Sequence, residues 1–385
     1  MADVPLANPP LAESARHPFA IIAGGGTAGH VVPALAIGRA LVARGHPATS
    51  IQYVGSRRGI EARLVPEAGF EITLMAGRGV ARRLSLQSAT AVASLAWAAV
   101  KAVVLVARRR PAVVVSVGGY ASVPCNVAAG LLRVPLVVAE QNAVPGLANR
   151  LAGRVARACA VSFAGTRLPR AVLTGNPVRP EILAVDRSPE GVLEAREALG
   201  LPANRALVAA FGGSLGSGRV NDAVLGLVAA WADRADVAVR HVVGARDWDD
   251  FSARIPSLPI GGLIYQPVRY EDRMDRLLQA ADVAVCRAGG SVAELAAVGI
   301  PAILVPLPGA PGDHQTANAR AFAEAGAAVV VPDRELSPGR LETELSELLG
   351  GPDRLRAMSL AARRLAHPDA ADRVADLVEE HARHG

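Results

Sequence analysis

The sequence is poor in cysteine, aromatic residues and lysine, and each shortage excludes a class of protein. Its three cysteines (Cys125, Cys159 and Cys286) are widely spaced and odd in number, which excludes a disulfide framework and a Cys-x-x-Cys metal clamp. Aromatic residues make up 3% of the chain, so the aromatic–basic interleaving typical of nucleic-acid binding is missing. Lys101 is the single lysine, which excludes a P-loop ATPase. We therefore expect a cytoplasmic protein that does not bind nucleic acid.

Segments that direct a chain into or across a membrane are also scarce. Residues 1–17 lack a basic start and a continuous apolar core, so they predict a flexible tail rather than a signal peptide. The stretch Ala89–Ala107 is about long enough to span a bilayer, but Lys101 interrupts it and many of its residues are alanines. An amphipathic or buried helix is therefore expected there, and a membrane span is the less favoured alternative.

Charge is distributed unevenly over a chain of 385 residues with 51% hydrophobic and 20% charged residues. This composition excludes a disordered chain or a fibre, and the length predicts about two domains. Residues 1–178 carry 19 Lys+Arg and 6 Asp+Glu, a balance of +13, whereas residues 179–385 carry 22 and 29, a balance of −7. The basic half predicts an anionic partner, either phosphate groups or an acidic membrane surface.

Short β-branched segments alternate with helical patterns along the whole chain. Near-continuous apolar strands between helices indicate parallel sheets covered on both faces. The pattern restarts after Gly175-Asn176-Pro177. We therefore predict an α/β protein of two doubly wound, Rossmann-like domains that face each other across a cleft. The expected parts are a tail (1–17), an N-terminal domain (18–178), a C-terminal domain (179–352) and a helical segment (353–385) that could pack back on the first domain.

Each half begins with a strand, a glycine-rich turn and the start of a helix. The first turn, residues 24–29, reads GGGTAG and satisfies G-x-G-x-x-G, and the second, residues 212–217, reads GGSLGS. Glycines let backbone N–H groups approach an anion at a helix N-terminus. Because no acid follows the second strand but Arg57 and Arg58 do, an NADP-dependent oxidoreductase is one alternative. Two such loops at equivalent places favour a substrate that carries a diphosphate.

Further polar groups follow other predicted strands or lie at the domain junction. They comprise Gly118-Gly119-Tyr120, Glu140-Gln141-Asn142, residues 174–179 (TGNPVR), residues 287–294 (RAGGSVAE) and residues 313–318 (DHQTAN). Carboxyl ends of parallel strands are where ligands bind in such sheets. Asp247-Trp248-Asp249-Asp250 resembles an Asp-x-Asp metal motif but lies between elements, so an exposed acidic loop is expected there.

The ordered set GGGTAGH, GGYASVP, EQN, GNPVR, GGSLGS, CRAGGSVAE and DHQTANA resembles one enzyme family over about Phe19–Val331. These are the bacterial UDP-N-acetylglucosamine–undecaprenyl-pyrophosphoryl-N-acetylmuramyl-pentapeptide N-acetylglucosaminyltransferases, which form lipid II. The resemblance implies an inverting, metal-independent glycosyltransferase of the GT-B fold without a cofactor. It implies UDP-N-acetylglucosamine as donor, lipid I as acceptor, and peripheral attachment to the cytoplasmic face of the cell membrane.

The resemblance also implies roles for individual residues. Donor contacts would come from Thr27, Ala28, Gly29, Asn142, Arg179, Ser214, Glu271, Ser291, Glu294 and Gln315. Of these, Ser214 would hold the diphosphate, Glu294 the ribose hydroxyls and Gln315 the sugar hydroxyls, with uracil against the backbone near Glu271. Acceptor contacts would come from Gly118, Gly119 and Tyr120.

Inversion requires a base that takes the proton of the acceptor hydroxyl. His30, directly after the first glycine loop, is the favoured candidate, because the ordinary pKa of histidine, ~6.5, is near working pH. Glu140 is the rival base, and a histidine that only caps the loop is the structural alternative. A UDP-N-acetylglucosamine epimerase of the same fold and a non-catalytic anion-binding protein are the other functions considered.

Overall fold

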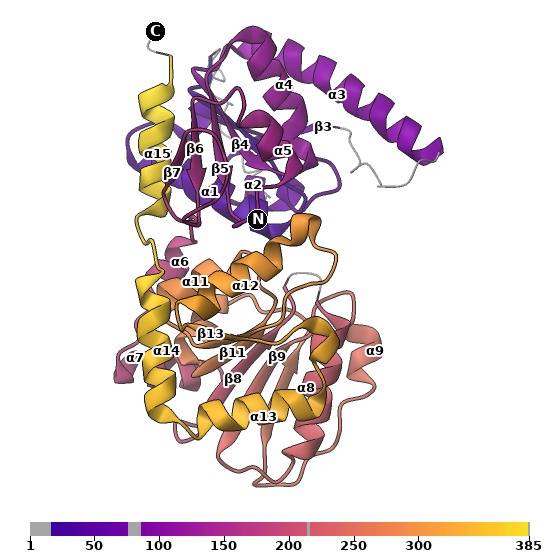
Figure 1. The fold of residues 1–385 in the computed structure, drawn as a ribbon, viewed down its shortest axis with the longest axis vertical. Helices are drawn as coiled ribbons and strands as arrows, with labels where there is room; N and C mark the ends of the chain where they lie inside the picture. The colour runs from indigo at the N-terminus through magenta and orange to yellow at the C-terminus, as the bar shows by residue number, and fades with distance from the viewer. Residues whose placement is uncertain (1–16, 76–85, 214–215, 384–385) are drawn as a thin grey trace, which may run out of the picture.

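The computed structural model describes residues 17–75, 86–213 and 216–383, with the backbone alone at 86–95. Within these ranges the chain forms two α/β domains, each built on one parallel sheet (Figure 1). The predicted fold class of two doubly wound domains is confirmed. The predicted tail lies outside the described residues apart from His17.

The first domain is built on a seven-stranded sheet of order β3-β2-β1-β4-β5-β6-β7. Its strands are β1 (Ala20–Gly24), β2 (Ile51–Ser56), β3 (Glu71–Met75), β4 (Val113–Gly118), β5 (Leu136–Glu140), β6 (Ala158–Val161) and β7 (Ala171–Leu173). Strands β4 and β5 are buried along their whole length. Their apolar residues do not alternate with polar ones, because helices cover both faces of the sheet.

Within the described ranges, five α-helices and two short 3-10 helices connect the strands of this domain. They are α1 (Ala28–Ala43), η1 (Ala48–Ser50), α2 (Glu61–Glu67), α3 (Leu86–Arg109), η2 (Tyr120–Ser122), α4 (Val123–Leu132) and α5 (Leu147–Ala152). The segment Ala89–Ala107 lies in α3, whose Ala98, Ala102 and Val106 are buried at a helical spacing. Among the helices of the described ranges, none has the length and apolar composition needed to cross a membrane. The expectation of an amphipathic or buried helix fits this face.

The second domain is built on a six-stranded sheet of order β10-β9-β8-β11-β12-β13. Its strands are β8 (Ala206–Phe211), β9 (Val237–Val242), β10 (Ile264–Val268), β11 (Val283–Cys286), β12 (Ala302–Leu304) and β13 (Ala328–Val330). Its helices are α6 (Pro180–Leu183), α7 (Pro189–Ala198), α8 (Gly218–Ala230), α9 (Trp248–Ser252), α10 (Met274–Ala280), α11 (Ser291–Val298), η3 (Pro311–Asp313), α12 (His314–Glu324), η4 (Asp333–Glu335), α13 (Pro338–Leu349) and α14 (Pro352–Arg364).

Local sequence explains where these helices begin and end. In α13 the side chain of Ser337 accepts the N–H of Arg340, which is the usual N-cap bond. Leu341, Leu345 and Leu348 of the same helix are buried at a helical spacing against the sheet. Helix α11 ends at Gly299, whose φ of 77° is the left-handed conformation that favours glycine at this position.

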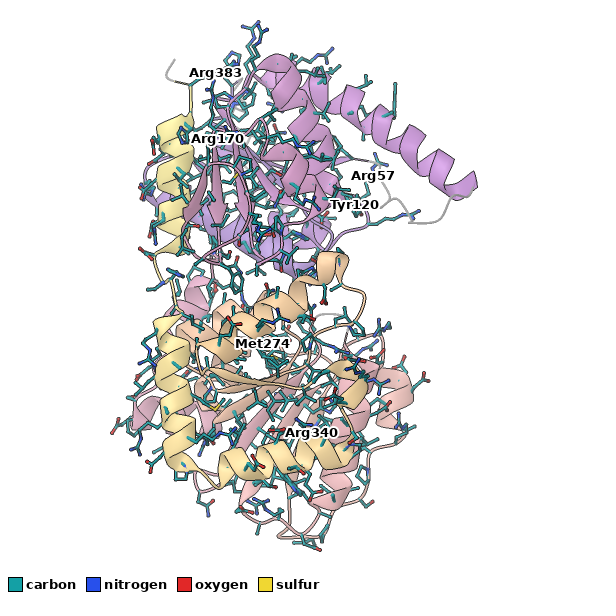
Figure 2. The ribbon with its side chains drawn as sticks, viewed as in Figure 1. Arg57, Tyr120, Arg170, Met274, Arg340 and Arg383 are labelled. Carbon is teal, nitrogen blue, oxygen red and sulfur yellow. The ribbon has the colours of Figure 1, made fainter. Side chains whose placement is uncertain are left out.

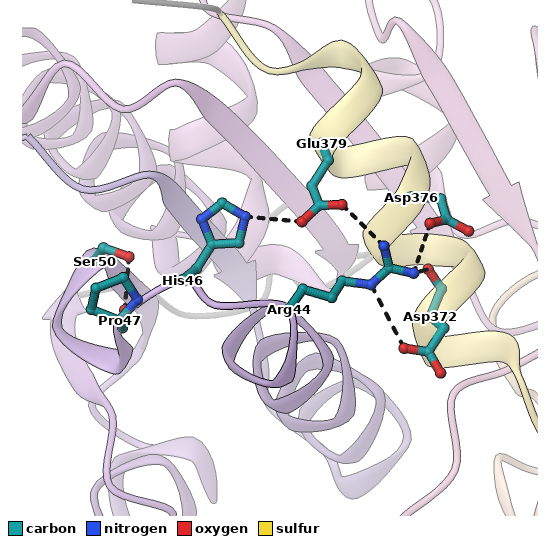
Figure 3. A network of polar contacts seen from close by, with 7 residues as sticks. All are labelled: Arg44, His46, Pro47, Ser50, Asp372, Asp376 and Glu379. Carbon is teal, nitrogen blue, oxygen red and sulfur yellow. Dashed lines mark hydrogen bonds and ion pairs between the residues drawn. The ribbon is translucent and has the colours of Figure 1, made fainter.

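The last helix, α15 (Ala370–His381), returns to the first domain, beside which it runs in Figure 1. Its apolar face belongs to the same buried core as α1 and β1, and comprises Val374, Ala375, Leu377 and Val378. On its polar face, Arg44 of α1's C-terminal end forms ion pairs with Asp372, Asp376 and Glu379 (Figure 3). The N-terminal domain therefore contains a helix from the far end of the chain.

The chain crosses between the domains twice, and the two crossings touch. The first follows β7 and contains Gly175, whose φ is 85°. A Cβ at Gly175 would overlap the side chain of His367, which lies in the second crossing between α14 and α15. Glycine is therefore required at this point of the junction.

Candidate functional site

The first glycine loop joins β1 to α1 and packs tightly against its neighbours. Gly26 has a φ of 95°, and a Cβ at Gly25 would overlap the carboxyl group of Glu61. Thr27 is the extended residue before α1, and its carbonyl accepts the N–H groups of His30 and Val31 at 3.1 Å each. The loop therefore places His30 on the first turn of the helix.

The N–H of Gly26 is already occupied by an acid of the chain itself. Glu61 Oε2 accepts this N–H at 2.8 Å, and Glu61 Oε1 accepts the N–H of Ser56 at 2.8 Å. A dinucleotide fingerprint would leave such loop amides free for phosphate. The group at the Gly26 N–H is instead the Glu61 carboxylate of the chain itself, and binding of a substrate anion by this loop stays a prediction.

The predicted acceptor motif lies directly beside this loop. Gly118 is the last residue of β4 and has a φ of 88°, and a Cβ there would lie 3.3 Å from Cδ2 of His30. Gly119 has a φ of 75°, and a Cβ there would lie 2.6 Å from the carbonyl oxygen of Gly25. Tyr120 donates its hydroxyl to Ser56 Oγ at 3.0 Å, and lies in the part of the first domain nearer the second (Figure 2). The two motifs thus form one surface.

His30 is half-buried at the centre of this surface. Its Nδ1 lies 3.1 Å from Thr27 Oγ1, and its Nε2 edge faces Gly118. Burial and the positive charge of His314, which comes from the second domain, lower the pKa of His30 to about 4. The imidazole is therefore neutral at pH 7, and the neutral form is the one that can accept a proton.

The carboxylate of Glu140, the rival base, is buried and has all its acceptor positions in use. Oε1 accepts the backbone N–H of Asn142 at 3.0 Å and its side-chain amide at 3.1 Å. Oε2 accepts the N–H of Gly146 and the Nδ2 of Asn149, both at 3.0 Å. Since a carboxylate has about four lone-pair sites, Glu140 has none left for a substrate proton.

The strand ends of the two domains meet through Asn318 of α12. Asn318 is completely buried, and its Oδ1 accepts the N–H of Ala143 at 2.8 Å. Its Nδ2 donates to Asn142 Oδ1 at 3.2 Å and to the carbonyl of Ala288 at 3.0 Å. Close by, a Cβ at Gly290 would lie 3.5 Å from the Cα of Gly29. The motifs of the two halves therefore come together at one interface.

Two of the predicted donor residues form an ion pair. Arg179 Nε and Nη2 both donate to Glu294 Oε1, at 2.9 and 2.8 Å. Burial raises the pKa of Glu294, and the charge of Arg179 opposes that rise. Arg179 precedes α6 at the domain junction and Glu294 lies in the first turn of α11, so the pair fixes this helix to the junction.

The second glycine loop is described except for Ser214 and Leu215, and the role predicted for Ser214 lies outside the described residues. Ser217, the residue before α8, accepts Arg287 Nε at 3.0 Å and Nη2 at 2.6 Å. Arg287 is buried, and its Nη1 lies 2.7 Å from Asp333 Oδ1. The loop is therefore anchored to the start of the RAGGSVAE segment.

The other predicted donor residues border the same region of the second domain. Gln315 Oε1 accepts the N–H of Leu307 at 3.0 Å, and its Nε2 lies close to Gly289. Ser291 is the first residue of α11. Glu271 is buried, with its carboxylate bound to Arg240 Nε at 2.7 Å and to the N–H of Arg273 at 3.1 Å. Both oxygens of the Glu271 carboxylate are therefore bound within the protein, so we do not expect this side chain to contact the uracil base directly.

The acidic motif at 247–250 is not the exposed loop that the sequence suggested. Asp247 precedes the short helix α9, and its half-buried carboxylate accepts Asn221 Nδ2 at 3.2 Å. Asp249 and Asp250 are exposed in that helix. Within the described ranges, no group of three or more His, Cys, Asp and Glu residues is arranged to hold a metal.

Sequence reasoning missed Glu61 altogether and gave no role to two other residues of this site, Arg287 and Asn318. Arg287 and Asn318 stand inside predicted motifs, so their positions were marked although their contacts were not. Glu61 offered only the weak signal of an acid at the start of a helix, which is common for reasons of helix stability alone.

Comparison with known proteins covers both domains. The Glycosyltransferase family 28 N-terminal domain matches residues 20–161, and the Glycosyltransferase family 28 C-terminal domain matches residues 207–374. A UDP-N-acetylglucosamine--N-acetylmuramyl-(pentapeptide) pyrophosphoryl-undecaprenol N-acetylglucosamine transferase of Desulforudis audaxviator is 40% identical over 380 residues, covering 95% of this chain and 99% of the relative. The enzyme of that name from Alkalilimnicola ehrlichii is 42% identical over 366 residues, covering 94% and 99%.

Solved structures give the same result for the fold. The crystal structure of MurG from Acinetobacter baumannii matches with a TM-score of 0.72 at 29% identity, covering 95% of this chain and 99% of that one. A UDP-GlcNAc 2-epimerase from Neisseria meningitidis matches with a TM-score of 0.65 at 12% identity, covering 94% and 99%, which shows a shared fold alone. The resemblance identified from the motifs is confirmed: the chain is a glycosyltransferase of family 28 and belongs to the UDP-N-acetylglucosamine--N-acetylmuramyl-(pentapeptide) pyrophosphoryl-undecaprenol N-acetylglucosamine transferases.

Proposed function

We propose that the protein transfers N-acetylglucosamine from UDP-N-acetylglucosamine to the C4 hydroxyl of the muramyl sugar of lipid I, with inversion, to form lipid II. The observation that carries the proposal is the meeting of the strand ends of the two domains, with His30 on one side and the Arg179–Glu294 pair on the other. A donor held by the second domain would then present its sugar to an acceptor held by the first.

The second domain supplies the donor site in this proposal. Glu294 accepts the ribose hydroxyls of UDP while Arg179 holds its carboxylate in place. Gln315 binds the sugar hydroxyls, Ser291 is a further donor contact, and the backbone near Glu271 binds uracil. From the first domain, Asn142 and the loop residues Thr27, Ala28 and Gly29 line the sugar. The role of Ser214 on the diphosphate stays a prediction from the sequence.

His30 is the proposed general base. It is neutral at working pH, and it adjoins Gly118 of the proposed acceptor surface formed by Gly118, Gly119 and Tyr120. The negative charge of a bound diphosphate would raise its pKa from about 4 toward working pH and make it a better proton acceptor. Glu140 is the weaker candidate, because four N–H donors already occupy its carboxylate.

Departure of UDP requires stabilisation of the negative charge that develops on its diphosphate. Helix α8 begins at Gly218, directly after the second glycine loop. Its N-terminal N–H groups and the positive end of its dipole therefore lie next to that loop. The loop and this helix end would carry out the stabilisation without a metal or a cofactor.

The alternative functions have less support. An NADP enzyme would need the Gly26 N–H that Glu61 occupies. An epimerase would share the donor site but has no use for an acceptor surface, and the 2-epimerase similarity extends only to the fold.

We also propose peripheral binding of the first domain to the acidic cytoplasmic face of the membrane, where the lipid-linked acceptor would reside. Exposed apolar side chains lie on α3, α4, α5 and the turn after α5, and we call them the α3–α5 patch: Trp97, Val100, Val104, Val127, Leu131, Leu147, Leu151 and Val155. Exposed arginines lie among them, at Arg133, Arg150 and Arg154. Between Glu71 and Glu181 the single acid is the buried Glu140. An apolar patch with cations and no exposed acid suits an anionic lipid surface.

The function is tested by incubating the protein with labelled UDP-N-acetylglucosamine, with and without a lipid I analogue. UDP release that depends on the analogue supports the transferase. Conversion of the donor sugar to an isomer in the absence of acceptor would instead support the epimerase. If neither reaction occurs, the result supports a non-catalytic anion-binding protein.

A further inference from the structure

An acid that no part of the proposed mechanism uses is buried under the first glycine loop. Glu61 begins α2, and 2% of its surface is exposed. Its two carboxylate oxygens accept one backbone N–H each, from Gly26 in the loop and from Ser56 at the end of β2, both at 2.8 Å. In the described part of the chain, Glu61 forms no ion pair with a cationic side chain.

Three glycines surround this carboxylate at very close range. A Cβ at Gly25, Gly55 or Gly59 would overlap the Glu61 side chain. Gly25 belongs to the first loop, whereas Gly55 and Gly59 belong to the end of β2 and the turn after it. The backbone of two loops is therefore shaped to fit around one buried anion.

Buried charges are normally expensive unless hydrogen bonds compensate for the lost hydration. Backbone N–H groups that converge in a turn provide that compensation for anions, and in dinucleotide-binding folds the anion is a phosphate. Here the first loop binds a carboxylate of its own chain at the same kind of place. The Gly26 N–H is consequently closed to a substrate phosphate.

The Glu61 carboxylate also connects the first glycine loop with His30, the predicted base, and with Tyr120, a predicted acceptor contact. Gly26 directly precedes Thr27, whose carbonyl and hydroxyl orient His30. Ser56, held through its N–H, accepts the hydroxyl of Tyr120 through its Oγ at 3.0 Å. One side chain thus sets the relative positions of the predicted base and the predicted acceptor contact.

We propose that Glu61 is a positioning residue for transfer. It holds the first glycine loop in the conformation that places His30, and it keeps the Gly26 N–H from binding a substrate phosphate. This inference rests on the proposed function. It predicts that loss of Glu61 lowers kcat, while UDP affinity, which depends on the second domain, is unchanged.

The test uses the full-length chain with Glu61→Ala, Glu61→Gln and the control Glu67→Ala. Glu67 lies on the same helix but is exposed, and it pairs only with Arg63 in the described structure. For Glu61→Ala we expect a kcat about 10²-fold lower, the scale of loss caused by a misplacement of about 1 Å. Glu61→Gln should lose activity as well, because its amide nitrogen cannot accept the second N–H. Glu67→Ala should match wild type.

Rescue of activity by acetate distinguishes a positioning role of the Glu61 carboxylate from a general loss of structure in the variant. It carries the missing carboxylate and fits the space that Glu61→Ala vacates, so it should restore kcat of that variant in a saturable manner. Chloride at the same ionic strength should not, and wild type should respond to neither. Acetate binding to Glu61→Ala is measured separately by calorimetry.

Each result has a defined consequence. A wild-type kcat in Glu61→Ala, or a lowered kcat with no acetate binding in a variant that still binds UDP normally, overturns the proposal. If Glu61→Ala does not fold, the isosteric Glu61→Gln decides, and full activity there overturns it. If wild type transfers no sugar, the proposed function fails instead, and acetate binding still decides whether the loop is built around an anion.

Discussion

Arg179 and Glu294 meet across the junction of the two domains, with both donors of the guanidinium directed at Oε1 of the carboxylate at 2.8–2.9 Å. The arrangement leaves Oε2 without a partner in the described part of the chain. A carboxylate held in this way is ready to accept hydroxyl hydrogen bonds at its second oxygen. It also stands beside a cation suited to a phosphorylated ligand.

This pair leads to a prediction about nucleotide affinity. Glu294→Ala should weaken binding of UDP and of UDP-N-acetylglucosamine together, by roughly 1.5–3 kcal/mol, the range for hydrogen bonds to a charged group. Calorimetry with both ligands measures the effect. Glu335→Ala, a change at an exposed ion pair of the same domain, serves as the control. Unchanged UDP affinity in Glu294→Ala would remove the ribose assignment.

Catalysis should depend on His30. His30→Ala is expected to lower turnover by ~10²–10⁴-fold, as for loss of a general base, with little change in UDP affinity. His381→Ala, at the end of α15, is the control. In wild type, kcat/KM should fall as pH drops through about 4, because protonated His30 accepts no proton. His314→Gln removes a cation that lowers this pKa, so the acid limb should move to higher pH. Full activity of His30→Ala would transfer the role to Glu140 or to water.

Membrane binding should be sensitive to charge placed in the α3–α5 patch. Leu131→Glu is expected to reduce co-sedimentation with anionic vesicles, because it replaces an exposed apolar side chain by an anion. Leu360→Glu, at another exposed leucine, in α14 of the second domain, should bind as wild type does. Binding of wild type should weaken with salt, since the Debye length falls from ~10 Å at 0.1 M to ~3 Å at 1 M. Release from membranes by detergent alone, never by salt, would contradict peripheral attachment.

Attachment of α15 should depend on Arg44. Arg44→Ala removes ion pairs to three acids of that helix and a hydrogen bond to the carbonyl of Asp372. Because the pairs are partly exposed but form a network, we expect a loss of about 1 kcal/mol in unfolding free energy, smaller at high salt. Amide hydrogen exchange should rise first in α15. Arg63→Ala, which breaks one exposed pair, is the comparison, and equal effects would show that the network adds nothing.

The stability of the folded protein at acid pH should depend on His241. This side chain is completely buried, where its nitrogens contact Asn221 Oδ1 and the Tyr265 hydroxyl, and burial lowers its pKa from 6.5 to about 3. Between these values the unfolded chain binds a proton that the native chain does not. Stability should therefore fall as pH decreases from 6.5 toward 3, by up to about 1.4 kcal/mol per pH unit. Urea unfolding of His241→Asn should show a shallower pH dependence, and an unchanged slope would contradict the assignment.

The sequence predicted the double α/β architecture because buried parallel strands are strongly apolar, as in β4 and β8. It did not predict β6, β7 or β10. Strand β6 is rich in alanine, β7 has three exposed residues, and β10 contains Pro267, so none carries the usual strand composition. Pairing with a neighbouring strand, which no local pattern reports, makes these segments strands.

Motifs at strand ends and at the domain junction marked residues that the structure brings together, while their roles stay predictions. Gly118 lies beside His30 at the carboxyl ends of neighbouring strands, and Arg179 of the junction pairs with Glu294. The contact of Asn318 with Ala143 could not be predicted, since it depends on how two separately folded domains meet. The burial of Glu61 depends on glycines in two different loops, and only the folded backbone brings these together.

The position of α15 has a consequence for how the protein is made. A ribosome delivers the chain from the N-terminus, and domains usually fold in that order as they emerge. Here the core around Val31 and Leu35 also contains Val374 and Val378, which follow the whole second domain in the sequence. If the N-terminal domain folds first, its apolar face should stay uncovered until α15 has been translated and has packed against it.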